Sequence, residues 1–186
     1  MSRVFFFDTS ALIHRYLDCP SSRKIRTIVS RRDTKCFVGE LTVLEMSSAI
    51  ARRLRKPRHD PNIIDLVNNR KFDRLESRFF RDISQDIIEV YPLSNTHYTR
   101  ARGLLRYAGV VKNRAITTVD ALIASAALDL AYKEKERINF CTSDRPLFKI
   151  ISGINAFTSA LNLRFYDPPL PPAPPPVAPT GVIAGP

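Results

Sequence analysis

Four acidic residues occupy positions from which they could carry metal chemistry. Asp8 and Asp144 each directly follow a short apolar run, and Glu45 and Asp120 each lie in the first turn of an expected helix. Two carboxylates 4 Å apart repel by roughly 4 kcal/mol at an effective dielectric of 20. Four such groups would protonate or separate unless a cation lay among them. Oxygen ligands alone suit a hard divalent ion, so the set predicts Mg²⁺ or Mn²⁺ rather than zinc.

Each of these acids also has a structural alternative. Asp8 could be the N-cap of the helix that follows it, and Asp144 could cap the turn before Pro146. Thr42-x-x-Glu45 fits a capping box, and Thr117-x-x-Asp120 is a weaker version of the same pattern. Capping is the commoner use of any one such residue, but it does not explain why all four acids lie at one edge of the expected fold.

The elements that must position these acids alternate along the chain. Strands and helices in alternation predict an α/β fold with a mostly parallel sheet of four to five strands. Sites in such sheets lie at the carboxyl ends of the strands, where Asp8 and Asp144 fall. The expected strands are 4–7, 35–38, 87–91, 138–142 and 163–166, and the expected helices are 10–17, 21–30, 42–55, 60–80, 95–107 and 118–133.

The charge of the chain favours a polyanionic partner. The formal net charge is +11, from 29 basic against 18 acidic residues, and such an excess is typical of nucleic-acid binding or of a solvated basic surface. Basic side chains bind phosphates without reading sequence. The densest basic cluster, which we expect to contact a nucleic acid, is Arg52, Arg53, Arg55, Lys56 and Arg58. Two others are Arg23, Lys24, Arg26, Arg31 and Arg32, and Arg100, Arg102, Arg106, Lys112 and Arg114.

Cysteine and histidine give no sign of a zinc cluster or a disulfide framework. The three cysteines and three histidines are scattered, and no CxxC pair occurs. Cys36 and Cys141 lie in apolar runs, so we expect them to pack in the core.

The composition divides the chain into two parts. Residues 167–186 contain nine of the fourteen prolines and one charged residue, which predicts a polyproline-type tail after a single domain at 1–166. The apolar run that begins at Val4 ends at Asp8, too short for a secretory signal. No apolar segment of about 18 residues occurs, so we expect a cytoplasmic protein without a membrane span.

Four segments resemble the motifs of PIN domains. They are Asp8-Thr9-Ser10-Ala11-Leu12, Leu41-Thr42-Val43-Leu44-Glu45, Val119-Asp120-Ala121-Leu122-Ile123-Ala124 and Phe140-Cys141-Thr142-Ser143-Asp144. The first and third are fairly specific, and the other two are weak alone. Order and spacing resemble the family from residue 4 to about 166, and the nearest likeness is to VapC-type toxins of toxin–antitoxin pairs. The stretch 52–86 is longer than in compact VapC-like toxins, and the proline-rich tail lies outside the family pattern.

The resemblance implies a three-layer α/β/α fold and metal-dependent cleavage of single-stranded or structured RNA. Asp8, Glu45 and Asp120 would then hold the metal directly or through water, and Asp144 would act through water or a second ion. Thr9, Ser10 and Thr142 would orient these carboxylates or a water molecule; helix capping is the alternative for Ser10. The resemblance also implies an antitoxin partner and a homodimer.

Other functions remain open on the sequence alone. One is a catalytically idle PIN-like module that binds RNA or a protein. A second is phosphate transfer through Asp8, although the D-x-D of haloacid-dehalogenase-type phosphatases is absent because Thr9 and Ser10 follow Asp8. A third is a polyproline ligand in the tail. Glu40 competes with Glu45 as the second acid, and Asp129 is expected to lie outside the acidic set.

Overall fold

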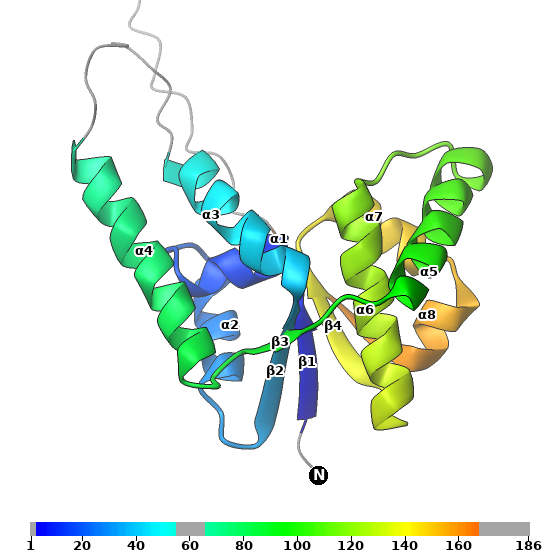
Figure 1. Ribbon diagram of the computed structural model, residues 1–186, viewed down its shortest axis with the longest axis horizontal. Coiled ribbons are helices and arrows are strands. Elements are labelled where there is room, and N and C mark those ends of the chain that lie inside the picture. Colours follow the sequence, from blue (N-terminus) through cyan, green and yellow to red (C-terminus); the bar gives the residue numbers. More distant parts are fainter. Residues whose placement is uncertain (1–2, 55–65, 168–186) are drawn as a thin grey trace, which may run out of the picture.

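A five-stranded, fully parallel sheet forms the centre of the computed structural model, which describes residues 3–54 and 66–167 (Figure 1). The strand order is β3-β2-β1-β4-β5, so that β1 lies between β2 and β4. Alternate side chains of β1 enter the two faces of the sheet, as the twofold period of a strand requires. The strands are β1 Arg3–Phe7, β2 Thr34–Gly39, β3 Glu89–Tyr91, β4 Ile138–Thr142 and β5 Leu161–Phe165.

Helices cover both faces of this sheet and produce three layers (Figure 1). The first group packs with Phe5 and Phe7 of β1, and the second packs with Val4 and Phe6. The first group is α1 Thr9–Leu12, the 3-10 helix η1 Ile13–Arg15, α2 Ser22–Val29, α3 Glu40–Leu54 and α4 Leu66–Ser84. The second is α5 Asn95–Arg106, the π-helical η2 Tyr107–Val111, α6 Thr118–Glu134, α7 Arg145–Ile151 and α8 Asn155–Ala160.

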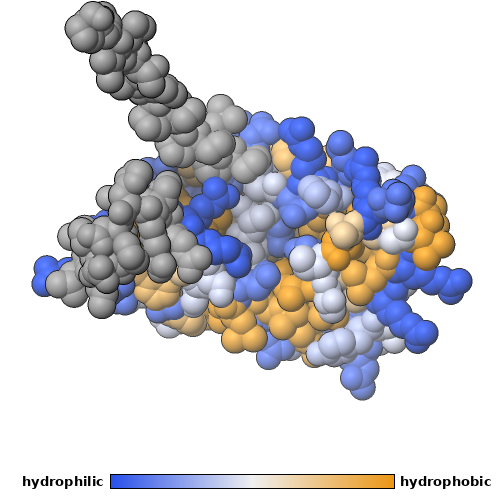
Figure 2. Space-filling view, turned by 90° about the horizontal axis from the view of Figure 1, so that it is seen from above, coloured by the Kyte–Doolittle hydropathy of each residue, from blue (hydrophilic) through white to orange (hydrophobic). Residues whose placement is uncertain are grey.

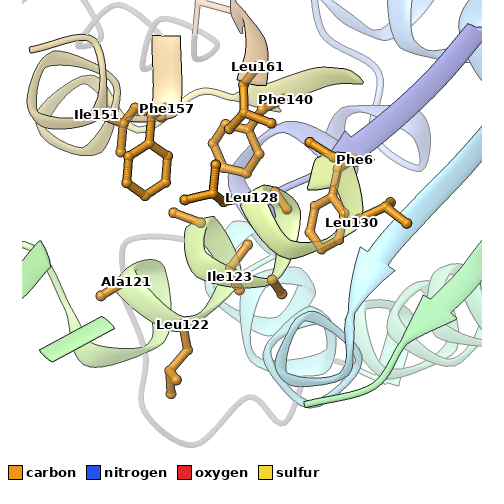
Figure 3. Packing of buried hydrophobic residues seen from close by; sticks show 14 of the residues in the cluster. Phe6, Ala121, Leu122, Ile123, Leu128, Leu130, Phe140, Ile151, Phe157 and Leu161 are labelled. Carbon is orange, nitrogen blue, oxygen red and sulfur yellow. The ribbon is translucent and has the colours of Figure 1, made fainter. Parts of the chain in front are cut away.

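The alanine-rich α6 fills the space beneath the second face. Nearly every side chain from Ala121 to Ala131 is buried, and Ile123 and Leu128 pack close to Phe6 and Phe140 of the two central strands (Figure 3). Small side chains let a helix approach a sheet closely on several sides at once. This packing fixes the start of α6, and with it Asp120, at the carboxyl edge of the sheet.

The structure confirms the predicted α/β/α fold and the predicted core positions of Cys36 and Cys141. The boundaries differ in places: α3 begins two residues before the expected start, β5 begins at Leu161 rather than 163, and α7 and α8 were not predicted. The last two helices are too short to show a helical period in the sequence. The expected start of a helix at Asp60 and the proline-rich tail from residue 168 lie outside the described residues.

No helix in the described part of the chain combines the length and apolarity needed to cross a bilayer. The longest described helix, α4, has a strongly charged sequence instead.

Candidate active site

One cavity at the carboxyl edge of the sheet brings the four predicted acids together. It has a volume of about 400 Å³ and is lined by Asp8, Glu45, Asp120 and Asp144. Asp8 follows β1 and Asp144 lies just beyond β4, and these strands are neighbours in the sheet (Figure 1). Figure 2 views the molecule from this edge; hydrophilic residues lie around the middle of the face, and hydrophobic residues gather along one side.

Asp8 is buried at the bottom of this set, with 1% of its surface exposed. It occupies the N-cap position of α1, as the capping alternative predicted, but its side chain makes no capping bond to the helix. Its Oδ2 atom instead accepts hydrogen bonds from Ser10 Oγ at 2.5 Å and Thr142 Oγ1 at 2.9 Å. Two of the three predicted supporting hydroxyls, those of Ser10 and Thr142, therefore hold Asp8.

The surroundings of Asp8 disfavour its charged form. Burial raises the pKa of Asp8 to about 7, and the negative charges of Asp120 and Glu45 add to this, whereas the hydrogen bonds from Ser10 and Thr142 oppose it. A nearby cation would stabilise the charged form of such a carboxylate and lower its pKa. Within the part of the chain that the structure describes, no positive side chain is among the causes that shift the pKa of Asp8.

Glu45 reaches the cavity from the second turn of α3, because that helix begins at Glu40. The predicted Thr42–Glu45 capping box was wrong, since β2 leads directly into α3 and Thr42 lies inside the helix. Thr9 Oγ1 donates to Glu45 Oε2 at 2.7 Å and fixes the carboxylate. The rival Glu40 is exposed and accepts from the backbone of Leu93 at 3.1 Å, outside the cavity.

Asp120 and Asp144 do cap helices, as the structural alternative predicted. Asp120 and Thr117 bond reciprocally, backbone to side chain, at 3.0 Å in each direction. Asp144 Oδ1 accepts from the backbone of Leu147 at 2.6 Å. Burial raises the pKa of Asp144, and the charge of Asp120 acts in the same direction. Each cap uses one carboxylate oxygen, so capping and metal binding are compatible at both positions.

The donor set fits a hard divalent ion that keeps part of its water shell. Within residues 3–54 and 66–167, no three His, Cys, Asp or Glu side chains converge as a ready-made metal cage. The four carboxylates face one cavity, with Thr and Ser hydroxyls beside them. Mg²⁺ is commonly bound through one or two carboxylates and several waters. Asp8, Glu45, Asp120 and Asp144 are the described residues that could hold such an ion.

Two of the predicted RNA-contacting arginines lie beside the acids. Arg52 and Arg53, near the end of α3, line the cavity and are exposed. Arg55, Lys56 and Arg58 lie outside the described residues. Cationic side chains beside an acidic cavity can hold a phosphate close to it despite the negative charge of the carboxylates.

Two residues near the cavity were not predicted as site residues. Thr117 lines it and orients Asp120; its place three residues before Asp120 was the available signal. His14 is buried and bonds to Ser143, and nothing in the sequence indicates this contact. Asp129 lies outside the acidic set as predicted, because it accepts from Tyr91 and Arg100 instead.

The fold and the cavity together define a parallel α/β protein with an acidic site at the strand ends. The family model of the PIN domain matches residues 5–151, and the chain belongs to this family. PIN domains are generally nucleases, and they generally use divalent metal ions. No curated protein sequence matches the chain.

Solved structures with the same fold are distant in sequence. VapBC2 from Rickettsia felis, bound to a DNA fragment from its promoter, is 17% identical with a TM-score of 0.51, covering 88% of this chain and 99% of that one. VapBC-5 from Mycobacterium tuberculosis is 13% identical with a TM-score of 0.51, over 88% and 98%. FitAcB from Neisseria gonorrhoeae is 16% identical with a TM-score of 0.52, over 87% and 96%. At these identities the likeness establishes the fold.

Proposed function

We propose that this protein is a Mg²⁺- or Mn²⁺-dependent endoribonuclease that cuts single-stranded or structured RNA by attack of water on a phosphodiester. The observation that carries the proposal is the meeting of Asp8, Glu45, Asp120 and Asp144 around one cavity. Membership of the PIN family supports the hydrolytic chemistry. The high pKa of Asp8 supports a cation as the missing partner of the acids.

In this proposal the carboxylates hold the metal ion, and the hydroxyl groups orient the carboxylates. Asp8, Glu45 and Asp120 hold the ion directly or through water, and Asp144 acts through water or at a second ion. A bound ion lowers the pKa of a coordinated water and neutralises charge on the phosphate. Thr9 holds Glu45 in place, while Ser10 and Thr142 perform the same task for Asp8 in two further hydrogen bonds.

Arg52 and Arg53 carry the contact with the RNA backbone. Both are exposed at the rim of the cavity, and the net charge of +11 attracts a polyanion over a longer range. Phosphate contacts of this kind position a strand without specifying its bases.

The proposal includes a role as the toxin of a toxin–antitoxin pair. The similar solved structures are described as VapBC and FitAB complexes, which supports a cognate antitoxin that binds this chain. A homodimer is part of the same proposal.

Cleavage of total RNA by the purified full chain tests the activity. Discrete products should form with Mg²⁺ or Mn²⁺ and disappear with EDTA or in Asp120→Asn, because asparagine keeps the cap but removes the charge. Glu40→Gln is the matched control: it removes an acid from α3 outside the cavity and should cut at the wild-type rate. Equal cleavage by wild type and Asp120→Asn would refute the assignment.

A second candidate is a PIN-like module that binds RNA without cutting it. The capping roles of Asp120 and Asp144 favour it, because both residues have a structural use without metal. This candidate predicts RNA binding that is unchanged by EDTA and by Asp8→Asn, together with no cleavage by the folded wild-type protein.

A further inference from the structure

A buried histidine contacts Ser143, the residue before Asp144 of the acidic cavity. His14, in η1, has 1% of its surface exposed. Its Nε2 atom lies 3.1 Å from Ser143 Oγ, and its Nδ1 atom lies 2.7 Å from Cys19 Sγ. Both ring nitrogens are therefore occupied, and the ring joins the loop after η1 to the segment that leads from β4 to Asp144.

Ser143 continues this connection to Asp8 through its backbone. The Ser143 N–H donates to Ser10 Oγ at 2.8 Å, and Ser10 Oγ donates to Asp8 Oδ2. A parallel path runs from the Asp144 N–H to Thr142 Oγ1, and from there to the same oxygen of Asp8, at 2.9 Å in each step. Because each hydroxyl accepts a backbone N–H, its own hydrogen is left to point at Asp8. The position of the Ser143 backbone thus decides how Asp8 is held.

One proton assignment satisfies every contact around the histidine. Ser22 Oγ donates to Leu17 O and accepts from the Cys19 backbone N–H, so the Cys19 thiol donates to Ser22 across their 3.0 Å contact. The thiol sulfur then accepts from His14 Nδ1, which leaves Nε2 as the acceptor of the Ser143 hydroxyl. Burial lowers the pKa of His14 to about 4, and Arg53 adds to this, which keeps the ring neutral as this assignment requires.

We propose that His14 is a positioning residue for the metal site: by accepting the Ser143 hydroxyl, it fixes the backbone that aims Ser10 at Asp8 and that carries Asp144. This inference rests on the proposed metal-dependent nuclease and deepens it. His14 does not touch the reacting atoms and acts only through Ser143. Residues that orient metal ligands in this way typically change metal affinity or activity by about 10- to 100-fold when they are replaced.

Replacing a histidine that only packs in the core should lower stability without changing Mn²⁺ affinity. The chain offers a matched control for this case. His97 is equally buried at 1% exposure, and its Nδ1 atom accepts from the Ser94 backbone at 2.9 Å. His97 lies in α5, and its Nε2 atom is 3.3 Å from Asp129 Oδ2. It is not among the residues that line the acidic cavity. Substitutions at His97 therefore measure the cost of removing a buried imidazole without a connection to the cavity.

Two substitutions separate the two contacts of the His14 ring, one to Cys19 and one to Ser143. The amide of asparagine reaches the position of Nδ1, so His14→Asn keeps the Cys19 contact and loses Ser143. The amide of glutamine reaches the position of Nε2, so His14→Gln keeps Ser143 and loses Cys19. The readout is Mn²⁺ affinity of the full chain without RNA, followed by electron paramagnetic resonance, beside urea unfolding in EDTA.

The positioning role predicts that His14→Asn weakens Mn²⁺ binding about tenfold or more, while His14→Gln stays near the wild type. Ser143→Ala should match His14→Asn, and the double variant should lose no more than either single one. His97→Asn should lose stability but keep its Mn²⁺ affinity. If His14→Asn fails to fold, Ser143→Ala alone decides, since it breaks the same link.

Equal Mn²⁺ affinities for wild type and Ser143→Ala, or a matched loss in His14→Asn and His14→Gln, would overturn the inference. The failure of the proposed function is distinguishable from this. It would show as a folded wild-type chain that neither binds Mn²⁺ nor cuts RNA, whereas failure of the positioning role requires a wild type that does both.

Discussion

Replacing Asp8 by asparagine should stabilise the metal-free protein at pH 8. The carboxyl group is 1% exposed, and burial raises its pKa from 3.8 to about 7. A shift of one pKa unit corresponds to about 1.4 kcal/mol, so a shift of this size costs the folded state about 4 kcal/mol when the group is ionised. Asparagine removes the charge, and its amide oxygen can still accept from Ser10 and Thr142.

The sign of the pH dependence follows from the two pKa values. Below about pH 3.8 the group is protonated in both folded and unfolded protein, so its contribution to stability is fully present. As the pH rises, the unfolded chain loses this proton first, and the contribution is lost progressively until about pH 7. The gap in unfolding free energy between Asp8→Asn and wild type should therefore grow from near zero at pH 4 to several kcal/mol at pH 8.

Urea unfolding in EDTA at pH 4, 6 and 8 measures this gap, because all other groups are common to both proteins. Mg²⁺ at one hundred times its Kd should narrow the gap at pH 8, because wild type gains about 2.7 kcal/mol under these conditions and Asp8→Asn gains less. A gap that is constant with pH, or a variant that is less stable than wild type at pH 8 in EDTA, would refute the reasoning.

Three other substitutions test separate parts of the structure. Thr9→Val removes the donor that fixes Glu45 and should lower the cleavage rate at saturating RNA while changing the unfolding free energy by about 1 kcal/mol, measured by urea unfolding. Arg53→Ala should raise the Kd for RNA and reduce the slope of log affinity against log salt by about 1 in filter binding; an unchanged slope would contradict a phosphate contact. Asp129→Asn removes the negative charge that Arg100 and Lys133 contact and should lower the unfolding free energy by about 2 kcal/mol without changing the cleavage rate. A rate loss in the fully folded variant would contradict its place outside the site.

The sequence predicted the alternation of strands and helices and the edge at which the acids meet, because both follow from local patterns. Asp8 and Asp144 follow apolar runs that can only be buried strands, and a parallel sheet places the ends of neighbouring strands together. The capping pattern around Asp120 was equally local, and its prediction was confirmed.

What the sequence could not predict depends on contacts between distant segments. The Thr42–Glu45 capping box was wrong because β2 passes directly into α3, a junction that has no distinct residue signal. The bond from Thr9 to Glu45 spans 36 residues, and that from His14 to Ser143 spans 129. Only the packed sheet brings these partners together.

Asp120 and Asp144 combine a helix cap with a proposed role in metal binding, and this affects what their presence in related proteins implies about activity. Both residues cap helices, so a descendant that has lost its activity is still under selection to keep them for folding. Asp8 has no such use and lowers stability when ionised, so its loss is favoured once activity is no longer needed. Among diverging copies of this gene, an intact Asp8 is therefore the better marker of retained function, and an intact Asp120 or Asp144 says little about it.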